Sequence, residues 1–304
     1  MTKFWMLVGL PGCGKSTWAN EHKNEYDFEI ISSDALRESL FGDINDQTHN
    51  NEVFDYMNKK VIDLLSEDKD VCYDATNINH KSRKSILNMI HNSNLKDIEC
   101  IAVLFETPIL TCYYRNKQRE RKVPEYVIDK MLHKFEIPFY QEGFDEIISI
   151  IPEHDPNYEL EDWTVSADEM AGKDQMNPHH TLDLLSHCYK CEDYILQRND
   201  LYDIQPEVCM AALFHDYGKL FTSIWDSEKQ ICHYFNHENV GAYHLLFVRF
   251  PKYLNRYKII FYVNYHMKPY ISDTSIKKLN EYKNLFKDEW INLVLLHEGD
   301  MYAH

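Results

Sequence analysis

The sequence predicts an α/β domain, built on a parallel sheet with helices on both faces, followed by an all-α domain. Up to about residue 151, short β-type runs alternate with helical stretches, which is typical of βαβ units. From residue 179 onward this alternation disappears, and long segments with helical apolar periodicity follow. A length of 304 residues fits two domains, because a domain has roughly 100–200 residues.

Five β-type runs are expected to form the sheet of the first domain. Between the second and third runs, Val53, Met57, Val61 and Leu65 recur at helical spacing, so a helix is expected there. In such sheets, ligands bind at the carboxyl ends of the strands. The five runs cover residues 4–10, 28–34, 70–76, 98–106 and 146–151.

The composition indicates a folded protein without a membrane span. Apolar residues make up 44% of the chain, close to the globular average, and no apolar run approaches the roughly 20 residues of a membrane helix. The N-terminal residues lack a signal-peptide pattern. The eight cysteines fall mostly within apolar runs, which indicates reduced thiols, so we expect a cytoplasmic location. Cys188 and Cys191 form a single C-x-x-C pair, which favours core thiols over zinc ligands.

The charge distribution argues against broad binding along a nucleic-acid duplex. The formal net charge is -17, whereas nonspecific duplex binding requires an extended basic surface. A nucleic-acid end would need only a local positive pocket, and residues 115–122 (RNKQRERK) are rich in cations. Residues 152–178 are acidic, contain three prolines and show no sustained period. We therefore expect them to connect a domain of residues 1–151 to one of residues 179–304.

The stretch GLPGCGKS, residues 9–16, fits the phosphate-binding loop (P-loop) pattern G-x-x-x-x-G-K-[ST] between an expected strand and an expected helix. Backbone N–H groups of such a loop turn inward around phosphate oxygens. Lys15 would neutralise the β- and γ-phosphates, and the Ser16 hydroxyl would ligate Mg²⁺. We therefore expect ATP or another NTP with Mg²⁺. The candidate nucleotide-binding residues are Gly9, Gly12, Gly14, Lys15, Ser16, Thr17, Arg115 and Arg119.

Three later features indicate how a phosphoryl acceptor would be bound. Asp34 follows the second strand and would accept the proton of an attacking hydroxyl, while Arg37 would hold an acceptor phosphate. Asp74 ends the third strand, where it would orient the Mg²⁺ shell or an arginine. Alone, each is equally well explained as a helix cap or a solvated face. The cations expected on a helix that closes over the triphosphate are Arg115, Arg119 and Arg121.

Residues 6–138 resemble the 5′-hydroxyl polynucleotide kinases of the phage kinase-phosphatase type, which are P-loop kinases. The shared stretches are PGCGKSTWA, SSDALRESL, DATNINHKSR and RNKQRERKVP. The resemblance implies Asp34 as general base for a 5′-OH, Arg37 as a contact to the acceptor phosphate and Asp74 as a site-organising carboxylate. It implies Arg119 and Arg115 as lid contacts to the donor phosphates. It ends after residue 151, because the D-x-D-G-T signature of that family's phosphatase is absent.

The C-terminal half contains histidines and aspartates in the order H…HD…H…H…D. An isolated histidine in an apolar helix is usually a core residue, but imidazoles mixed with carboxylates form a ligand set for Mn, Fe, Co, Ni or Zn. The helix that carries the HD pair is expected to begin at Pro206 and end at Gly218. The candidate metal ligands are His187, His215, Asp216, His237, His266 and Asp300.

This set resembles the HD phosphohydrolase superfamily over about residues 179–304. The resemblance implies one metal ion bound by the first histidine, the HD pair and the last aspartate of the pattern. It implies a second ion that shares Asp216 and is also bound by His237 and His266. The sequence leaves open whether one or two ions bind. A metal pair would lower the pKa of a bridging water for in-line attack on phosphorus. The ligands of the first ion would be His187, His215, Asp216 and Asp300.

Lys219 is expected to bind a phosphate oxygen at this metal site, because it lies one helical turn after His215. His180 would do the same, whereas His179 is as well explained by a helix start. Glu238 follows His237 and is equally consistent with a partner of a metal ligand or with a helix cap.

The two resemblances together imply an enzyme that heals RNA or DNA ends. One half would phosphorylate 5′-OH ends with an NTP, and the other would hydrolyse a 2′,3′-cyclic phosphate or a terminal 2′- or 3′-phosphate. A nucleic-acid ligase would act downstream, and no membrane partner is expected. Two alternatives stay open. One is a small-metabolite or nucleoside kinase fused to an HD nucleotide phosphohydrolase, and the other is a nucleotide-sensing regulator that gates the hydrolase.

Overall fold

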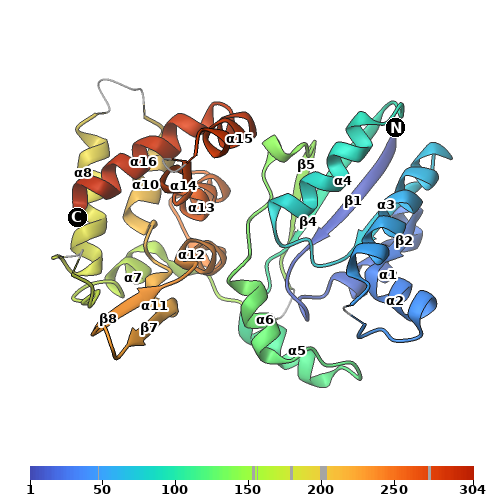
Figure 1. Ribbon diagram of the computed structural model, residues 1–304, viewed down its shortest axis with the longest axis horizontal. Coiled ribbons are helices and arrows are strands. Elements are labelled where there is room, and N and C mark those ends of the chain that lie inside the picture. The colour runs from blue at the N-terminus through green and yellow to red at the C-terminus, as the bar shows by residue number, and fades with distance from the viewer. Residues whose placement is uncertain (47, 153–154, 156, 179–180, 199–203, 273–274) are drawn as a thin grey trace. The chain divides into compact units, whose positions relative to one another are not determined.

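A computed structural model of the chain describes all residues except 47, 153–154, 156, 179–180, 199–203 and 273–274 (Figure 1). The chain forms two compact units. The first unit contains Met1–Ile128 and Pro138–Tyr158, and the second contains Asp129–Ile137 and Glu159–His304. The expected domain limits differ from these units in two places. Residues 129–137 belong to the second unit, and the expected connecting segment 152–178 is divided between the units after residue 158.

Residues 129–137 join the second unit through side-chain and backbone contacts that the sequence pattern does not reveal. The Phe135 ring packs edge-on against Tyr243 with ring centroids 5.0 Å apart. The backbone N–H of Ile137 donates to Asn264 Oδ1 at 2.7 Å. Phe135, Ile137 and Asn264 are all buried, so this short segment is part of the core of the second unit.

The first unit is built on a five-stranded parallel sheet with the order β2-β3-β1-β4-β5. Nearly every side chain of β1 and β4 is buried. Because successive side chains of a strand point to opposite faces, both faces of the sheet are covered. The predicted parallel sheet with flanking helices is therefore confirmed. Its strands are β1 (Thr2–Val8), β2 (Phe28–Ser32), β3 (Asp70–Asp74), β4 (Ile98–Phe105) and β5 (Glu146–Ile150).

Helices make the crossovers that parallel strands require. The predicted apolar face lies on α3 (Asn50–Ser66), where Val53, Met57, Val61 and Leu65 are buried. The other helices in residues 1–158 are α1 (Lys15–Tyr26), α2 (Ser33–Phe41), α4 (His80–Asn92), α5 (Ile109–Gln118), α6 (Glu125–Leu132), which runs on into the second unit, and the 3-10 helix η1 (Tyr140–Glu142).

The second unit is mainly helical, with α8 packed against α10 and α16, and α13 packed against α10 and α12 (Figure 1). These packed helices or the turns at their ends carry the histidines of the H…HD…H…H…D pattern. The helices are α7 (Trp163–Asp168), α8 (Leu184–Leu196), α10 (Pro206–Phe214), α11 (Lys219–Thr222), α12 (His237–Leu245), α13 (Arg256–Tyr265), α14 (Lys268–Ser272), α15 (Ile276–Phe286) and α16 (Glu289–Ala303).

The expectation of helices throughout this region is wrong at one hairpin and at one further short strand. Strands β7 (Ser223–Asp226) and β8 (Ile231–Tyr234) pair antiparallel. Each has four residues, which is too short for an alternating pattern to be distinguished from a helical one. Two further short strands, β6 (Glu161–Asp162) and β9 (Val248–Arg249), pair in parallel.

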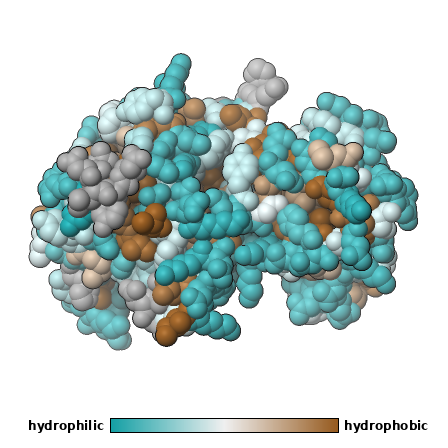
Figure 2. All heavy atoms as spheres, turned by 90° about the horizontal axis from the view of Figure 1, so that it is seen from above, coloured by the Kyte–Doolittle hydropathy of each residue, from teal (hydrophilic) through white to brown (hydrophobic). Residues whose placement is uncertain are grey.

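Hydrophilic residues cover most of the face shown in Figure 2, with small separate apolar patches. Among the described residues, no helix combines the length and the apolar character that crossing a membrane requires. All eight cysteines are free thiols, and Cys188 and Cys191 lie fully buried on α8.

A buried ion pair connects α4 to the 3-10 helix η1, which precedes β5. Arg83 donates to both carboxylate oxygens of Glu142, at 2.7 and 2.6 Å, and both side chains are 0% exposed. Arg83 Nη1 also donates to the carbonyl of Asn77 at 2.9 Å. Asn77 Nδ2 in turn donates to the carbonyl of Leu7 near the end of β1 at 2.8 Å. The ion pair therefore supports the carboxyl-terminal edge of the sheet, where ligands of such folds bind.

Replacing Arg83 by Gln should strongly destabilise the first unit, because it leaves the Glu142 carboxylate buried without its cation. The expected loss is roughly 3–5 kcal/mol. The double variant Arg83→Met/Glu142→Leu should recover most of this loss, since neither charge remains buried. Urea unfolding followed by tryptophan fluorescence measures both. Equal stability of the single variant and the wild type would contradict the structural role of the pair.

Candidate phosphate-binding site and candidate metal centre

The predicted phosphate-binding loop joins β1 to α1 and is closed by its own lysine. Lys15 Nζ donates to the carbonyls of Gly9 and Leu10, at 2.9 and 2.8 Å. Gly12 has a positive φ of 88°, and a Cβ there would lie 2.4 Å from the carbonyl oxygen of Cys112. Only glycine therefore fits at this position, for both backbone and steric reasons. The loop presents its N–H groups and the start of α1 to the same space, as a phosphate site requires.

Two oxygen ligands suited to Mg²⁺ lie beside this loop. The Ser16 hydroxyl donates to Asp74 Oδ2 at 2.7 Å. Burial raises the pKa of Asp74, while Lys15 and the Ser16 hydroxyl act in the opposite direction. A hydroxyl and a carboxylate next to a phosphate cradle are donors that Mg²⁺ prefers, so the residues fit an NTP-bound Mg²⁺. Asp74 thus lies where the sequence predicted it, at the end of β3.

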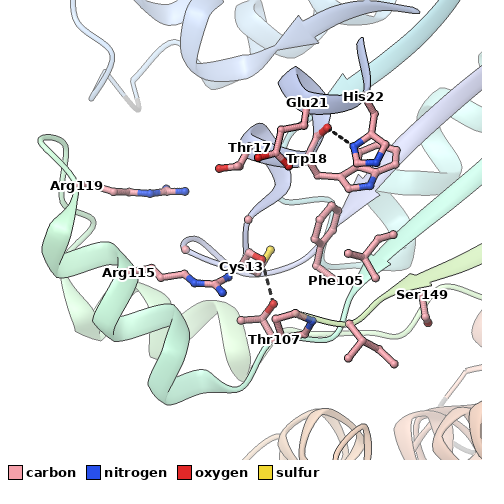
Figure 3. Close-up of a pocket in the computed structure, with 15 residues that line it drawn as sticks. Cys13, Thr17, Trp18, Glu21, His22, Phe105, Thr107, Arg115, Arg119 and Ser149 are labelled. Carbon is pink, nitrogen blue, oxygen red and sulfur yellow. Dashed lines mark hydrogen bonds between the residues drawn. The ribbon is translucent and has the colours of Figure 1, made fainter. Parts of the chain in front are cut away.

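A cavity of about 790 Å³ adjoins the loop, a size that suits a cofactor or nucleotide (Figure 3). Trp18, Phe105 and Pro152 supply apolar walls, and Arg115 and Arg119 line the cavity on the other side of the loop. In Figure 3 both guanidinium groups extend toward the phosphate-binding loop. The cavity therefore combines an apolar part with a cationic part, as a nucleotide requires. The remaining lining residues are Gly12, Cys13, Gly14, Thr17, Glu21, His22, Thr107, Ser149, Ile150 and Ile151.

The expectation that Arg119 and Arg121 lie on a helix is wrong. Helix α5 ends at Gln118, and both arginines belong to the loop before α6. Asn116 closes this loop, because its Nδ2 donates to the carbonyl of Val123 at 2.7 Å and its Oδ1 accepts from the N–H of Val123 at 2.9 Å. Repulsion among successive cations also disfavours continuation of the helix.

Asp34 lies between two arginines. Ser32 Oγ accepts from the N–H of Ala35 and so begins α2, which places Asp34 in its first turn. Arg37 is buried; its Nη1 donates to Asp34 Oδ1 at 3.1 Å and its Nη2 to Asn50 Oδ1 at 2.7 Å. Burial lowers the pKa of Arg37; the Asp34 charge opposes this decrease, and the nearby Arg121 adds to it.

Arg121 differs from its expected position over the triphosphate. It forms an ion pair with Asp34 Oδ2, and the lining of the nucleotide cavity includes Arg115 and Arg119 instead. No spacing in the sequence indicates this contact, because Arg121 and Asp34 are far apart along the chain and meet only through the loop after α5.

In the second unit, three histidine rings are oriented by backbone carbonyls. The Nδ1 atoms of His215, His237 and His266 lie 2.7, 2.9 and 2.7 Å from the carbonyl oxygens of the residues three positions earlier. A carbonyl only accepts, so each Nδ1 carries a proton, and Nε2 is the ring atom left to bind a metal ion when the ring is neutral. This is the orientation that histidine ligands of metals adopt.

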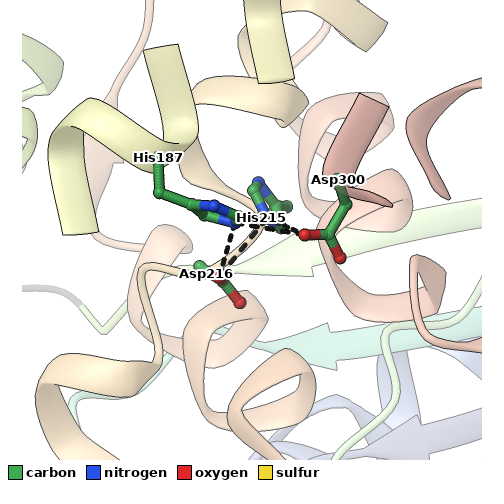
Figure 4. Close-up of side chains that lie close together, drawn as sticks. All are labelled: His187, His215, Asp216 and Asp300. Carbon is green, nitrogen blue, oxygen red and sulfur yellow. Dashed lines mark hydrogen bonds and ion pairs between the residues drawn. The ribbon is translucent and has the colours of Figure 1, made fainter. Parts of the chain in front are cut away.

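The Nε2 atoms of His187 and His215 lie near the buried carboxylates of Asp216 and Asp300 (Figure 4). His187 Nε2 lies 3.3 Å from Asp216 Oδ2 and 3.1 Å from Asp300 Oδ1, and His215 Nε2 lies 3.4 Å from each of these oxygens. Together these four residues form one group of donor atoms within 4.8 Å of one another.

Asp216 also belongs to a second group, because its other oxygen faces the remaining histidines. His237 Nε2 lies 3.1 Å from Asp216 Oδ1 and 3.3 Å from His266 Nε2. The structure thus brings together all six predicted ligands, with Asp216 between the two groups.

The chemistry of these donors fits metal ions. Burial, together with His237 and His215, lowers the pKa of His266 to about 3, so this ring is a neutral donor. Burial opposes the charged form of Asp216, but Lys219 and His215 outweigh it and hold the pKa of this carboxyl well below its usual range. Asp300 Oδ1 is buried and lies near the Nε2 atoms of His187, His215 and His304, but none of the described residues makes a well-aligned hydrogen bond to it. Buried polar atoms normally have a partner, and a cation would provide one.

Gly218 allows the turn that carries His215 and Asp216 to approach the start of α12, which carries His237. Helix α10 begins at Pro206 as predicted but ends at Phe214, and His215–Gly218 form a turn, so the expected helix end at Gly218 is wrong. The N–H groups of Tyr217 and Lys219 donate to carbonyls three residues earlier, which tightens this turn. A Cβ on Gly218 would lie 1.9 Å from the carbonyl oxygen of His237. Glycine therefore lets the turn meet the start of α12.

Lys219 has protein partners in the structure. Its Nζ lies 2.6 Å from Asp216 Oδ2 and donates to Gln175 Oε1 at 2.8 Å, and the side chain is buried. Its contact with a substrate phosphate stays a prediction. Glu238 lies 3.9 Å from His237 Nδ1, which donates instead to a backbone carbonyl. His179 and His180 lie outside the described residues.

Sequence reasoning missed three side chains beside the metal centre. The Tyr270 hydroxyl donates to Asp300 Oδ2 at 2.7 Å, and Gln175 accepts from Lys219. His304 Nε2 lies 3.4 Å from Asp300 Oδ1, and the spacing of four residues on α16 is a signal that would have found it. Tyr270 and Gln175 have no such local signal.

Comparison with known proteins finds similarity in the N-terminal half. Residues 4–138 match the family model described as an AAA domain. A curated relative, the L-seryl-tRNA(Sec) kinase of Methanococcus maripaludis, is 26% identical over 145 residues, which cover 46% of this chain and 55% of the relative. The chain thus spans about half the length of this relative. The N-terminal half is thus similar to P-loop kinase domains, and its P-loop, Ser16–Asp74 pair and adjoining cavity fit ATP or another NTP with Mg²⁺.

Several solved structures are also similar to the chain. A chain of the "Structure of the Pnkp1/Rnl/Hen1 RNA repair complex" is 28% identical, with 43% of this chain and 42% of that chain covered and a TM-score of 0.37. A gluconokinase from Sinorhizobium meliloti 1021 is 14% identical, with coverages of 50% and 84% and a TM-score of 0.37. A fungal RNA kinase is 17% identical, with coverages of 70% and 48% and a TM-score of 0.40.

The two donor groups predict a stepwise loss of metal binding. Metal-free protein dialysed against Mn²⁺ should take up two ions per chain, one for each group. His266→Ala should remove one, and Asp216→Asn should remove both, because Asp216 belongs to both groups. Elemental analysis of the protein measures the ratio, with His233→Ala on β8 as the control. Wild-type stoichiometry in Asp216→Asn would contradict the shared ligand.

Proposed function

We propose that this chain is a nucleic-acid end-healing enzyme with RNA as its principal substrate. The kinase half would phosphorylate 5′-OH ends, and the second unit would hydrolyse 2′,3′-cyclic phosphates or terminal 2′- or 3′-phosphates as an HD phosphohydrolase. The observation that carries the proposal is the convergence of His187, His215, Asp216, His237, His266 and Asp300 in a chain that also has a kinase site. Cleavage by many ribonucleases leaves such a pair of ends, and a ligase would join them after repair.

In the kinase half, the donor triphosphate would lie along the phosphate-binding loop with Lys15, Arg115 and Arg119 on its phosphates. The Asp34 carboxylate would accept the proton of the acceptor 5′-OH as that oxygen forms its bond to the γ-phosphorus. The bond from this phosphorus to the bridging oxygen would break, and the nucleoside diphosphate would carry the resulting charge. Arg37 would hold a phosphate of the acceptor.

In the second unit, the two histidine–aspartate groups would hold one or two transition-metal ions such as Mn, Co, Ni, Fe or Zn. Bound ions would supply the positive charge that lowers the pKa of a water and stabilises charge on the phosphoryl oxygens. The carbonyl-bonded Nδ1 atoms keep the histidine rings in place, and Tyr270 orients Asp300. Lys219 neutralises Asp216 and, while it keeps this contact, would donate to a phosphate oxygen of the substrate at the same site.

One specific observation favours a different acceptor. The similarity to an L-seryl-tRNA(Sec) kinase suggests that the hydroxyl could belong to an aminoacyl group attached to RNA, and not to a 5′ end. Asp34 and Arg37 would serve either acceptor. Small-metabolite kinase and nucleotide-sensing roles stay alternatives, and the same acceptor assay distinguishes all of them.

Wild-type protein should transfer the γ-phosphate of labelled ATP to a 5′-OH oligoribonucleotide. Lys15→Ala and Asp34→Ala should each reduce this transfer by roughly 100-fold or more, because one loses a phosphate contact and the other the general base. The exposed Asp55→Asn on α3 is a matched control and should retain activity. Transfer only to seryl-tRNA, a nucleoside or a sugar would contradict the proposed acceptor.

The hydrolase half should open or remove a 2′,3′-cyclic phosphate on RNA in the presence of Mn²⁺, Co²⁺ or Ni²⁺. Asp216→Ala should reduce this activity to the level of the metal-free protein and leave the kinase intact, while Asp34→Ala should do the reverse. Chromatography of the 3′ ends measures the products. Loss of both activities in either folded variant would contradict two separate sites.

A further inference from the structure

A row of tyrosines and cations lies where α8 packs against α16. Lys190 and Tyr194 are one turn apart on α8, and Arg198 follows in the turn after this helix. Tyr302 of α16 joins them, because its ring centroid lies 5.0 Å from that of Tyr194. Lys190 Nζ lies 5.5 Å from the centre of the Tyr302 ring, and the guanidinium carbon of Arg198 lies 3.3 Å from the centre of the Tyr194 ring. We call these four side chains the α8–α16 surface.

The two cations of the α8–α16 surface have donors to offer an anion. Neither Lys190 nor Arg198 forms an ion pair with a carboxylate of the described residues. The nearby Glu298 accepts from the Tyr194 hydroxyl instead, at 3.4 Å. Arg198 Nη1 donates to the carbonyl of Tyr194 at 3.0 Å. A guanidinium has five N–H donors and an ammonium has three, so donors remain for phosphate oxygens.

The rings of this surface are suited to stacking with bases. Tyr302 is 55% exposed, so much of its ring faces solvent. Cation–π contacts hold Lys190 and Arg198 beside the rings. Proteins that bind single-stranded nucleic acid use this combination, in which bases stack on aromatic rings while neighbouring cations contact the phosphates.

The α8–α16 surface begins at the candidate metal centre. Tyr302 lies two residues after Asp300, near the end of α16 that lies beside α8 (Figure 1). His304 Nε2 lies 3.4 Å from Asp300 Oδ1, and the His304 ring centroid lies 5.3 Å from that of His187. The side chains of His187 and Asp300 are buried, whereas that of His304 is 30% exposed. His304 therefore connects the metal centre to the surface that carries Tyr302.

We propose that the α8–α16 surface binds single-stranded nucleic acid and leads its 3′ end to the metal centre. A base stacks on Tyr302, and Lys190 and Arg198 contact phosphates of the strand. The nucleotides bound here are those that precede the terminal phosphate. The second unit then acts on strand ends in preference to free cyclic nucleotides. This inference rests on the proposed hydrolase function.

Steady-state hydrolysis of two substrates tests the inference. One is a 2′,3′-cyclic mononucleotide, and the other is a 5′-phosphorylated oligoribonucleotide with the same cyclic end. The wild type should have the lower KM for the oligonucleotide. Tyr302→Ala should raise this KM roughly 5- to 100-fold, the range expected for the loss of one stacked base. The effect on the mononucleotide should be much smaller, whereas a disturbance of α16 would affect both substrates alike.

Further variants separate the ring from the charges. Tyr302→Phe keeps the ring and should restore the KM for the oligonucleotide. Lys190→Gln and Arg198→Gln should each reduce the slope of log KM against log salt by about 0.7, the value for one phosphate contact of a single strand. Tyr253→Ala, at an 80% exposed tyrosine of the second unit, is the matched control and should change neither KM. Circular dichroism checks that each variant folds.

Photocrosslinking locates the contact without catalysis. Metal-free protein is irradiated with an oligoribonucleotide that carries 4-thiouridine next to its 3′-terminal nucleotide. Mass spectrometry of the digested protein should place the crosslink on α8 or α16, and Tyr302→Ala should lose most of it.

The inference and the proposed function fail in different ways. Equal wild-type KM values for the two substrates would show that the strand adds nothing to binding, and would leave the hydrolase standing. An unchanged oligonucleotide KM in Tyr302→Ala, Lys190→Gln and Arg198→Gln, or crosslinks outside both helices, would remove the α8–α16 surface from the path of the strand. A wild type inactive on both substrates would overturn the proposed hydrolase function itself.

Discussion

The second unit depends on keeping one buried carboxylate charged. Asp216 is almost inaccessible to solvent, and a buried ion without a partner costs several kcal/mol. Its charge is balanced by Lys219 at 2.6 Å, and Nε2 atoms of His187, His215 and His237 lie within 3.4 Å of its oxygens. Because these groups come from different elements, their helices must pack closely. The steric requirement at Gly218 follows from the same constraint, since only glycine lets the turn after Asp216 approach α12.

The two candidate sites are suited to ions of opposite charge. The first offers donors to anions, namely backbone N–H groups and the side chains of Lys15, Arg115 and Arg119. The second is suited to cations, because its imidazoles donate through Nδ1 to carbonyls and so point Nε2 toward the carboxylates. A net charge of -17 favours the binding of cations, as at the second site. A site for anions in such a chain needs a local concentration of cations, which residues 115–122 provide. Arg115 and Arg119 of this stretch line the cavity beside the phosphate-binding loop.

Local patterns made most of the fold and the ligand residues predictable. The strands of the sheet, the loop from Gly9 to Ser16 and the six candidate metal ligands each have a spacing with a physical meaning. The features that the sequence did not predict are mostly contacts between segments that are distant in sequence. Residues 129–137 join the second unit through Phe135, and Arg121 reaches Asp34 through a loop whose path is set by Asn116. The β7–β8 hairpin was missed because four-residue strands carry too little periodicity.

The two candidate sites share one spacing of aspartate and cation but differ in how exposed that ion pair is. In each, an aspartate is followed three residues later by its cation: Asp34 by Arg37, and Asp216 by Lys219. The Asp34 side chain is 47% exposed, whereas that of Asp216 is 3% exposed. Exposed ion pairs contribute little stability and exchange readily, whereas separation of a buried pair leaves a charge without a partner. The contacts of Asp34 therefore exchange readily, whereas Asp216 stays charged and fixed between two groups of candidate ligands. The same local motif thus serves as a replaceable contact in one unit and as a permanent support in the other.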